Sequence, residues 1–120
     1  MKNPKREHLE TCLDKYGYAT IYFYNKYRGV DIPNYLKEEN SATLIKISNG
    51  FAYTPTFTQD SFVMKLSFRG EYYECNIPYA SIVFIGGSND ESLCKYYEID
   101  FSTEKNIQSA LLAEIEEDND

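Results

Sequence analysis

Two runs of alternating residues, joined by a two-residue turn, constrain the fold of this 120-residue chain most strongly. In the first run, apolar Phe62, Met64, Leu66 and Phe68 alternate with Val63, Lys65 and Ser67. Arg69 and Gly70 follow, and in the second run Tyr73, Cys75 and Ile77 alternate with Tyr72, Glu74 and Asn76. Because successive side chains of a strand point to opposite faces, a period of two predicts an antiparallel hairpin with one face buried.

The rest of the chain predicts one helix and several short strands around this hairpin. Between Pro4 and Gly17, apolar residues recur at helical spacing, so residues 4–16 are predicted to be a helix that ends at the glycine. Runs of β-branched and aromatic residues predict strands at 18–27, 42–48, 81–87 and 95–101. Pro55 places 51–57 at an edge or a bend, and the polar stretch 35–41 is predicted to be a loop.

These elements predict a mainly β, α+β domain over residues 1–101, followed by an acidic and flexible tail at 102–120. The helix would cross one end of a small, strongly bent open barrel or of a pair of packed sheets. With 42% hydrophobic residues, including 12 Tyr and 7 Phe, the chain has enough apolar surface for one core. Half-buried sheet faces and binding grooves both suit tyrosine.

Charge is distributed unevenly and argues against several partners. Residues 1–89 carry 10 Lys and Arg against 9 Asp and Glu, whereas residues 90–120 carry 2 Lys against 10 acidic residues. A neutral body with an acidic end is unsuited to nucleic acid or to an anionic membrane surface.

There is no run of about 18 apolar residues and no signal-peptide pattern at the start. With three scattered cysteines and no CxxC pattern, we expect a cytoplasmic protein with reduced thiols.

Residues for catalysis are scarce in this sequence. His8 is the single histidine, and near the start of a predicted helix it is expected to be structural. Neither a zinc-ligand set nor a nucleophile–histidine–acid set is evident, and no glycine-rich phosphate loop occurs. We therefore expect no enzyme, no metal and no cofactor. A sheet with open edges and large apolar side chains instead favours binding of an extended peptide, through main-chain hydrogen bonds and side-chain pockets.

The order of motifs resembles that of the stringent starvation protein B (SspB) family over roughly residues 5–88. After the N-terminal helix, "IYFYNKYRGVDIP" is similar to a family strand that ends in "GVxVP". "LIKIS" corresponds to the family's "IVLNI", "MKLSFRG" to "FNARFGG" and "CNIP" to "VSVP". Phe68, Gly70 and Pro78 match these motifs.

The resemblance implies an Sm-like fold and an adaptor that captures ssrA-like degradation tags and delivers tagged proteins to the ClpXP protease. It implies homodimerisation through the helix stripe Leu9, Cys12, Leu13 and Tyr16. It also implies a peptide groove lined by Phe51, Ala52, Tyr53, Met64, Lys65, Leu66, Ser67 and Phe68. About half of the strand residues among these should face the core. The main alternative is an Sm-like peptide- or protein-binding module that does not deliver to a protease; an RNA-binding ring is disfavoured by the neutral body.

Two departures from the family pattern affect these expectations. Ser67 stands where "FNARF" has arginine, although Arg69 is two residues further on and can take its place. Family members end in a basic and apolar module that docks on the ClpX unfoldase, and this chain has none after its acidic segment. Either the tail is shorter than usual, or the patch Ala110, Leu111, Leu112 and Ile115 substitutes for that module, or the chain does not deliver to ClpX. The alternative for the patch is a short helix packed on the body.

Overall fold

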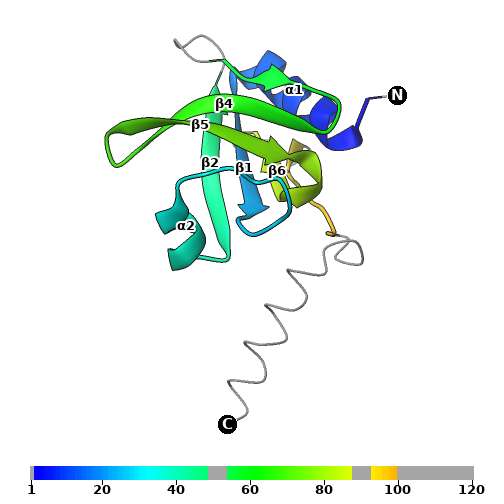
Figure 1. Cartoon of the computed structure of the whole chain (residues 1–120). Helices are drawn as coiled ribbons and strands as arrows, with labels where there is room; N and C mark the ends of the chain where they lie inside the picture. Colours follow the sequence, from blue (N-terminus) through cyan, green and yellow to red (C-terminus); the bar gives the residue numbers. More distant parts are fainter. Residues whose placement is uncertain (1, 49–53, 88–92, 100–120) are drawn as a thin grey trace.

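The chain forms an N-terminal helix and two antiparallel sheets in a computed structural model, which describes residues 2–48, 54–87 and 93–99 (Figure 1). The elements in chain order are α1 (Pro4–Tyr16), β1 (Tyr18–Tyr24), α2 (Asn34–Glu39), β2 (Ala42–Ser48), β3 (Thr56–Phe57), β4 (Ser61–Phe68), β5 (Glu71–Pro78), a 3-10 turn (Tyr79–Ser81), β6 (Ile82–Gly86) and β7 (Lys95–Tyr96). The predicted α+β class is confirmed, with two sheets rather than a closed barrel.

Helix α1 begins and ends at the residues that the sequence predicts. The side chain of Asn3 accepts a hydrogen bond from the Lys5 backbone N–H at 2.8 Å, and Pro4 occupies the first turn. Gly17 ends the helix in the left-handed region, with φ at 80°, and its N–H donates to the Leu13 carbonyl at 2.8 Å. The apolar side of α1 packs on β1 and β6.

The first sheet has the order β2-β1-β6-β7 and is antiparallel throughout. Ile21 on β1 lies between Ile45 on β2 and Ile85 on β6. Ala19, Ile21 and Phe23 are completely buried, so this side of the sheet faces the core. The alternation in β1 therefore directs its tyrosines and Thr20 to the opposite, outer face.

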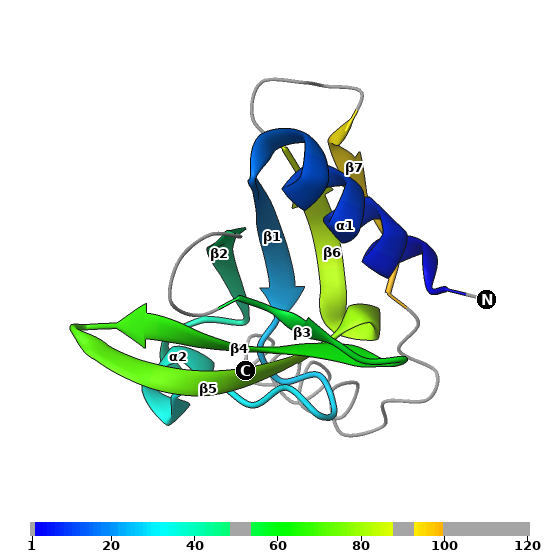
Figure 2. The ribbon, with the colours of Figure 1, turned by 90° about the horizontal axis from the view of Figure 1, so that it is seen from above.

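The second sheet has the order β3-β4-β5 and contains the predicted hairpin. Its register runs from Ser61 opposite Pro78 to Phe68 opposite Glu71. The turn residues Arg69 and Gly70 both have positive φ, at 52° and 82°, as a tight two-residue hairpin turn requires. Figure 2 shows β4 and β5 running across the strands of the first sheet, and apolar side chains of both sheets share one core.

Three predictions of secondary structure are wrong. Residues 35–41 were expected to be a loop, but Asn34–Glu39 form the short helix α2. β1 ends at Tyr24, and β7 contains only Lys95 and Tyr96. For α2 the reason is tertiary: Leu36 packs on the core, although the segment has no apolar periodicity of its own. Residues 100–120 lie outside the described part of the chain.

Candidate functional site

The predicted peptide-binding residues of β4 lie on both faces of its sheet. Met64 is 7% exposed, and Leu66 and Phe68 are half-buried against the core. Lys65 and Ser67 are exposed on the other face, opposite Glu74 and Tyr72 of β5. The expectation that about half of these strand residues face the core is confirmed. Of the predicted residues on β4, Lys65 and Ser67 are the exposed ones.

One edge of β4 is only partly covered within the described residues. β3 pairs with Phe62 and Val63 alone, whereas β5 pairs with β4 along its whole length. On the β3 side, the stretch from Met64 to Phe68 has no described strand beside it. The predicted groove residues Phe51, Ala52 and Tyr53 fall in the part of the chain that is not described. Such a strand edge has backbone groups available to pair with an extended chain.

The core shared by the two sheets is flanked by a set of half-buried apolar side chains, which we call the inner wall. It consists of Leu36 on α2, Ile45 on β2, and Leu66 and Phe68 on β4, all packed on the same core. Figure 2 shows β2 and α2 next to the hairpin formed by β4 and β5. Because these side chains are neither fully buried nor fully exposed, they can gain apolar contact from a ligand without refolding of the core.

Arg69, the suggested substitute for the family's arginine, is bound to α2. Its Nη2 lies 2.8 Å from Glu39 Oε1, and its guanidinium carbon lies 3.9 Å from the centre of the Tyr35 ring. The exposed ion pair contributes little stability, but it balances the Arg69 charge and connects the hairpin turn to α2. Lys65 is exposed in the middle of β4, opposite Glu74 of β5.

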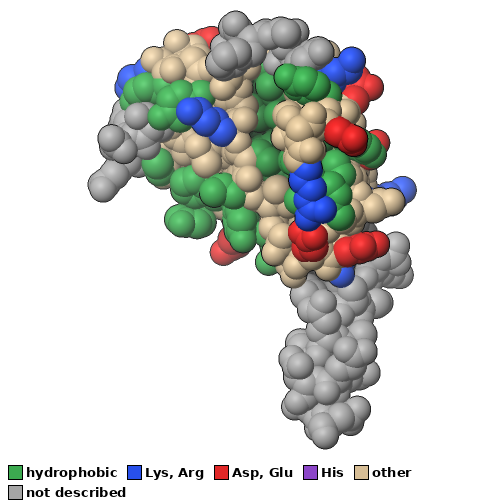
Figure 3. All heavy atoms as spheres, turned by 90° about the vertical axis from the view of Figure 1, so that its left-hand side faces the viewer, with side chains coloured by type: hydrophobic (Ala, Val, Ile, Leu, Met, Phe, Trp, Pro, Cys, Tyr) green, Lys and Arg blue, Asp and Glu red, His purple; other side chains and the backbone are tan. Residues whose placement is uncertain are grey.

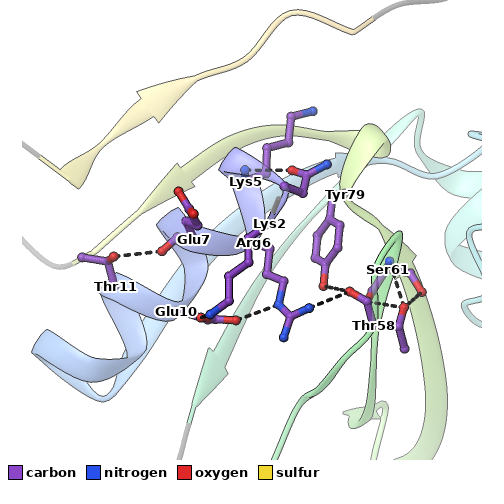
Figure 4. Close-up of polar contacts among 10 residues, drawn as sticks. Lys2, Lys5, Arg6, Glu7, Glu10, Thr11, Thr58, Ser61 and Tyr79 are labelled. Atoms are coloured by element: carbon purple, nitrogen blue, oxygen red, sulfur yellow. Dashed lines mark hydrogen bonds and ion pairs between the residues drawn. The ribbon is translucent and has the colours of Figure 1, made fainter.

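Polar contacts between α1 and the loop before β4 position the start of this strand (Figure 4). Arg6 Nη1 donates to the Thr58 carbonyl at 3.3 Å, and the buried Tyr79 hydroxyl donates to the same oxygen at 2.8 Å. Arg6 also pairs with Glu10 at 2.7 Å. Hydrogen bonds from Lys2 and Arg6 hold the pKa of the Glu10 carboxyl below its ordinary value. Burial raises the pKa of Tyr79 to about 12, so its hydroxyl stays a donor.

The predicted dimer stripe on α1 is mostly inside the domain, which corrects the sequence-based assignment. Leu9 and Cys12 are completely buried and Leu13 is 3% exposed, whereas Tyr16 is half-buried. The three buried side chains contact the sheet of their own chain and cannot reach a second copy. A one-sided apolar stripe shows that a helix is covered, but it does not identify the covering surface.

His8 connects α1 to the chain around β7. Its Nδ1 lies 2.7 Å from the Tyr97 hydroxyl, and its Nε2 bonds to the Leu93 carbonyl. A carbonyl only accepts, so in the neutral ring Nε2 carries the proton and Nδ1 accepts from Tyr97. Nearby, Lys5 Nζ donates to the Ile82 carbonyl at 2.8 Å, and burial lowers the Lys5 pKa to about 8. With both ring nitrogens bonded, His8 has a structural role in this fold.

The described residues contain no group of three or more His, Cys, Asp or Glu that is able to hold a metal ion. Cys12 and Cys75 are buried and Cys94 is exposed. Burial raises the pKa of the Cys75 thiol to about 12, which makes this cysteine a poor nucleophile. Within the same described ranges, no helix has the length and apolar character needed to cross a bilayer.

An apolar surface on the outer side of the first sheet, which we call the aromatic face, was not predicted from the sequence. Leu44, Tyr22, Phe84 and Tyr96 lie side by side on the four strands, and Tyr18, Tyr24 and Val83 flank them. Leu44 is 61% exposed, Tyr22 40% and Tyr96 81%. Beside this row is a hollow of about 400 Å³, lined partly by Tyr22, Tyr24 and Tyr96. Figure 3 shows exposed hydrophobic side chains at its lower left, on the side away from the β4–β5 hairpin.

A signal for the aromatic face was present in "YATIYFY", where the outward positions are mostly tyrosine instead of polar. Comparison with family models and curated proteins assigns no family to this chain. No family model matches the chain, and no curated protein matches it. The likeness to SspB therefore rests on the order and spacing of the motifs in the sequence.

Proposed function

We propose that this chain is a non-enzymatic cytoplasmic adaptor that binds extended, ssrA-like degradation tags along β4 and delivers tagged proteins to the ClpXP protease. The observation that carries the proposal is the edge of β4 from Met64 to Phe68, which no described strand covers. A tag lying along this edge would continue the sheet. Its main chain would bond to β4, and its alternate side chains would contact the inner wall or the exposed Lys65 and Ser67.

Delivery requires a second contact, with the unfoldase. The acidic segment 102–120 contains the apolar patch Ala110, Leu111, Leu112 and Ile115, which we propose as the docking contact. A tether of this kind raises the local concentration of the tag near its destination without adding contacts to the tag itself. We also propose that the adaptor is a homodimer.

A second candidate is an Sm-like peptide-binding module that does not deliver to a protease. It is favoured by the bonding of Arg69 to Glu39, because the suggested substitute for the family's arginine is then already occupied by an acidic partner. The tag preference of such a module would differ from that of the family. Acceleration of ClpXP degradation separates the two candidates.

The binding experiment uses fluorescence anisotropy with a labelled ssrA-type peptide, for which we expect a Kd in the micromolar range, on the order of −8 kcal/mol. Lys65→Glu reverses an exposed charge on β4 and should weaken binding of an acidic-ended tag about tenfold, or about 1.4 kcal/mol. Lys26→Glu, an exposed lysine outside the strands, is the matched control and should bind like the wild type. If both variants bind equally well, the assignment to β4 is wrong.

N-methylated peptides test the strand-pairing mode directly. Alternate N–H groups of a paired strand point to its partner, so methylation at every second peptide position should weaken binding and the positions between should tolerate it. For delivery, removal of residues 106–120 should abolish acceleration of tagged-substrate degradation and leave peptide affinity unchanged. Tight binding without any acceleration by the full chain would favour the non-delivering module.

A further inference from the structure

The aromatic face is unusual for the outer side of an antiparallel sheet, which is normally polar where it meets water. Its central row crosses all four strands without interruption by a polar side chain. The Phe84 and Tyr96 rings already contact each other, with centroids 4.9 Å apart, so the row is an ordered apolar surface. We propose that two copies of this chain associate through the aromatic face, with their β2-β1-β6-β7 sheets packed against each other.

The near absence of charge on the aromatic face favours a second copy of the chain as its partner. Of the outward-facing residues on β1, β2, β6 and β7, only Lys46 is charged, and its Nζ lies 4.1 Å from the centre of the Tyr18 ring. A strongly acidic or basic partner would find almost no opposite charge here. An uncharged aromatic surface is the complementary occupant, and the same face on another copy is such a surface.

The exposed area is also of the size that a dimer needs. With roughly 200 Å² for a tyrosine side chain, the exposed fractions of Tyr22 and Tyr96 correspond to roughly 80 and 160 Å². Leu44 and the half-buried neighbours bring the apolar area to about 400–500 Å². A standard interface buries about 800 Å² on each partner, of which somewhat more than half is apolar. The aromatic face therefore supplies the apolar centre of one such interface.

A two-fold axis parallel to the strands gives a specific pairing. Because the row runs from Leu44 through Tyr22 and Phe84 to Tyr96, the rotation places Leu44 of one copy opposite Tyr96 of the other, and Tyr22 opposite Phe84. Lys46, on the edge strand β2, does not meet its own copy in this arrangement. Facing sheets pack about 10 Å apart with their strands nearly aligned, which accommodates facing aromatic side chains.

The aromatic face gives a specific surface to the homodimer of the proposed function and rests on that part of it, but not on peptide capture. The face lies on the opposite side of the first sheet from its core, so a partner there leaves the β4 edge free. Leu9, Cys12 and Leu13 on α1 are buried and expose almost no apolar surface to a second copy, whereas the side chains of the aromatic face are exposed. A monomeric protein that still binds tags would overturn the dimer and leave the proposed tag capture intact.

Sedimentation equilibrium of the full chain, from about 1 to 200 µM, measures the association. The wild type should be a dimer in the upper part of this range. Tyr22→Arg and Leu44→Glu should each weaken dimerisation at least tenfold, because each buries an unpaired charge in the interface. Tyr72→Arg, an exposed tyrosine on β5 at 63% exposure, is the matched control and should dimerise like the wild type. Far-UV circular dichroism verifies that each variant is folded.

The pairing itself is tested by disulfide formation in a Cys94→Ser background. Leu44→Cys protein mixed with Tyr96→Cys protein should form a covalent heterodimer under mild oxidation, more than either protein alone. A monomeric wild type, or dimers that persist unchanged in both charged variants, would overturn the proposal. The proposal is also overturned if the full chain is monomeric and a variant truncated at residue 105 dimerises. In that case the C-terminal segment of the same chain occupies the aromatic face.

Discussion

Asn25 is completely buried and links β1 to the segment that contains α2 and the start of β2. Its Nδ2 donates to the Leu36 carbonyl at 3.0 Å and to the Asn40 carbonyl at 2.9 Å. Its Oδ1 accepts from the Thr43 hydroxyl. Asn25→Asp keeps the shape of the side chain but replaces the donating amide by an oxygen that faces two carbonyl oxygens.

The expected cost follows from these contacts. Two hydrogen bonds are lost, at about 1 kcal/mol each, and two buried carbonyls lose their partner. A carboxylate is also left in an apolar interior without a cation. Together these effects should lower the free energy of unfolding by about 3–5 kcal/mol at pH 7, the cost of leaving a buried charge uncompensated when one partner of an ion pair is removed. The melting temperature should fall by at least about 10 °C.

The loss of stability caused by Asn25→Asp should be smaller in acid. Burial and the two carbonyl dipoles favour the protonated form of the introduced carboxyl, so its folded-state pKa is raised above its unfolded value of about 3.9. The folded variant then binds more protons than the unfolded chain, and its stability decreases as the pH rises through the folded pKa. Compared with the wild type, Asn25→Asp should therefore lose less stability at pH 4.5 than at pH 7.

Urea unfolding followed by far-UV circular dichroism is the suitable assay, because the chain has no tryptophan. Asn34→Asp, an exposed asparagine at the first position of α2, makes the same chemical change and should alter stability by less than about 0.5 kcal/mol. If Asn25→Asp costs less than about 1 kcal/mol at pH 7, or costs more in acid, the role assigned to Asn25 is refuted.

Four further outcomes are expected. At pH 8 a thiol reagent should modify only Cys94 in the folded protein, and all three cysteines after denaturation. Leu13→Glu should unfold the chain, as judged by circular dichroism, instead of producing a folded monomer, because Leu13 lies in the core. Tyr79→Phe should cost about 1 kcal/mol in urea unfolding through its lost bond to the Thr58 carbonyl. Between pH 8 and 10, the wild type should gain stability relative to Lys5→Met. The reason is that the folded state releases the Lys5 proton near pH 8, whereas the unfolded state retains it to about 10.5. Equal pH profiles of stability for the two proteins would contradict the burial of this amine.

Features with a local cause were predictable. Pro4 and Gly17 mark both ends of α1 because proline suits a first turn and glycine suits a left-handed cap. The hairpin register follows from alternation around Arg69-Gly70, since a slip by one residue would reverse every side chain. α2 was missed because its helix depends on contacts of Leu36 and Asn40 with residues distant in sequence.

The candidate site was predicted in part. The sequence predicted peptide-binding residues in β4, but only the packed structure shows that Met64 faces the core while Lys65 faces solvent. It also assigned Arg69 to a ligand, although Glu39 of α2 is its observed partner. Both points depend on the position of the second sheet and of α2, which no short pattern contains.

By itself, the sequence determined the α+β class, the hairpin and the two ends of α1, because each depends on side chains within a few residues of one another. Tertiary structure alone decided what each apolar surface covers. The α1 stripe covers its own sheet, and the outer tyrosines of β1 join Leu44, Phe84 and Tyr96 in one exposed row. The hydrophobic effect has no direction and does not specify a partner, so an apolar stripe predicts burial but not the surface that buries it.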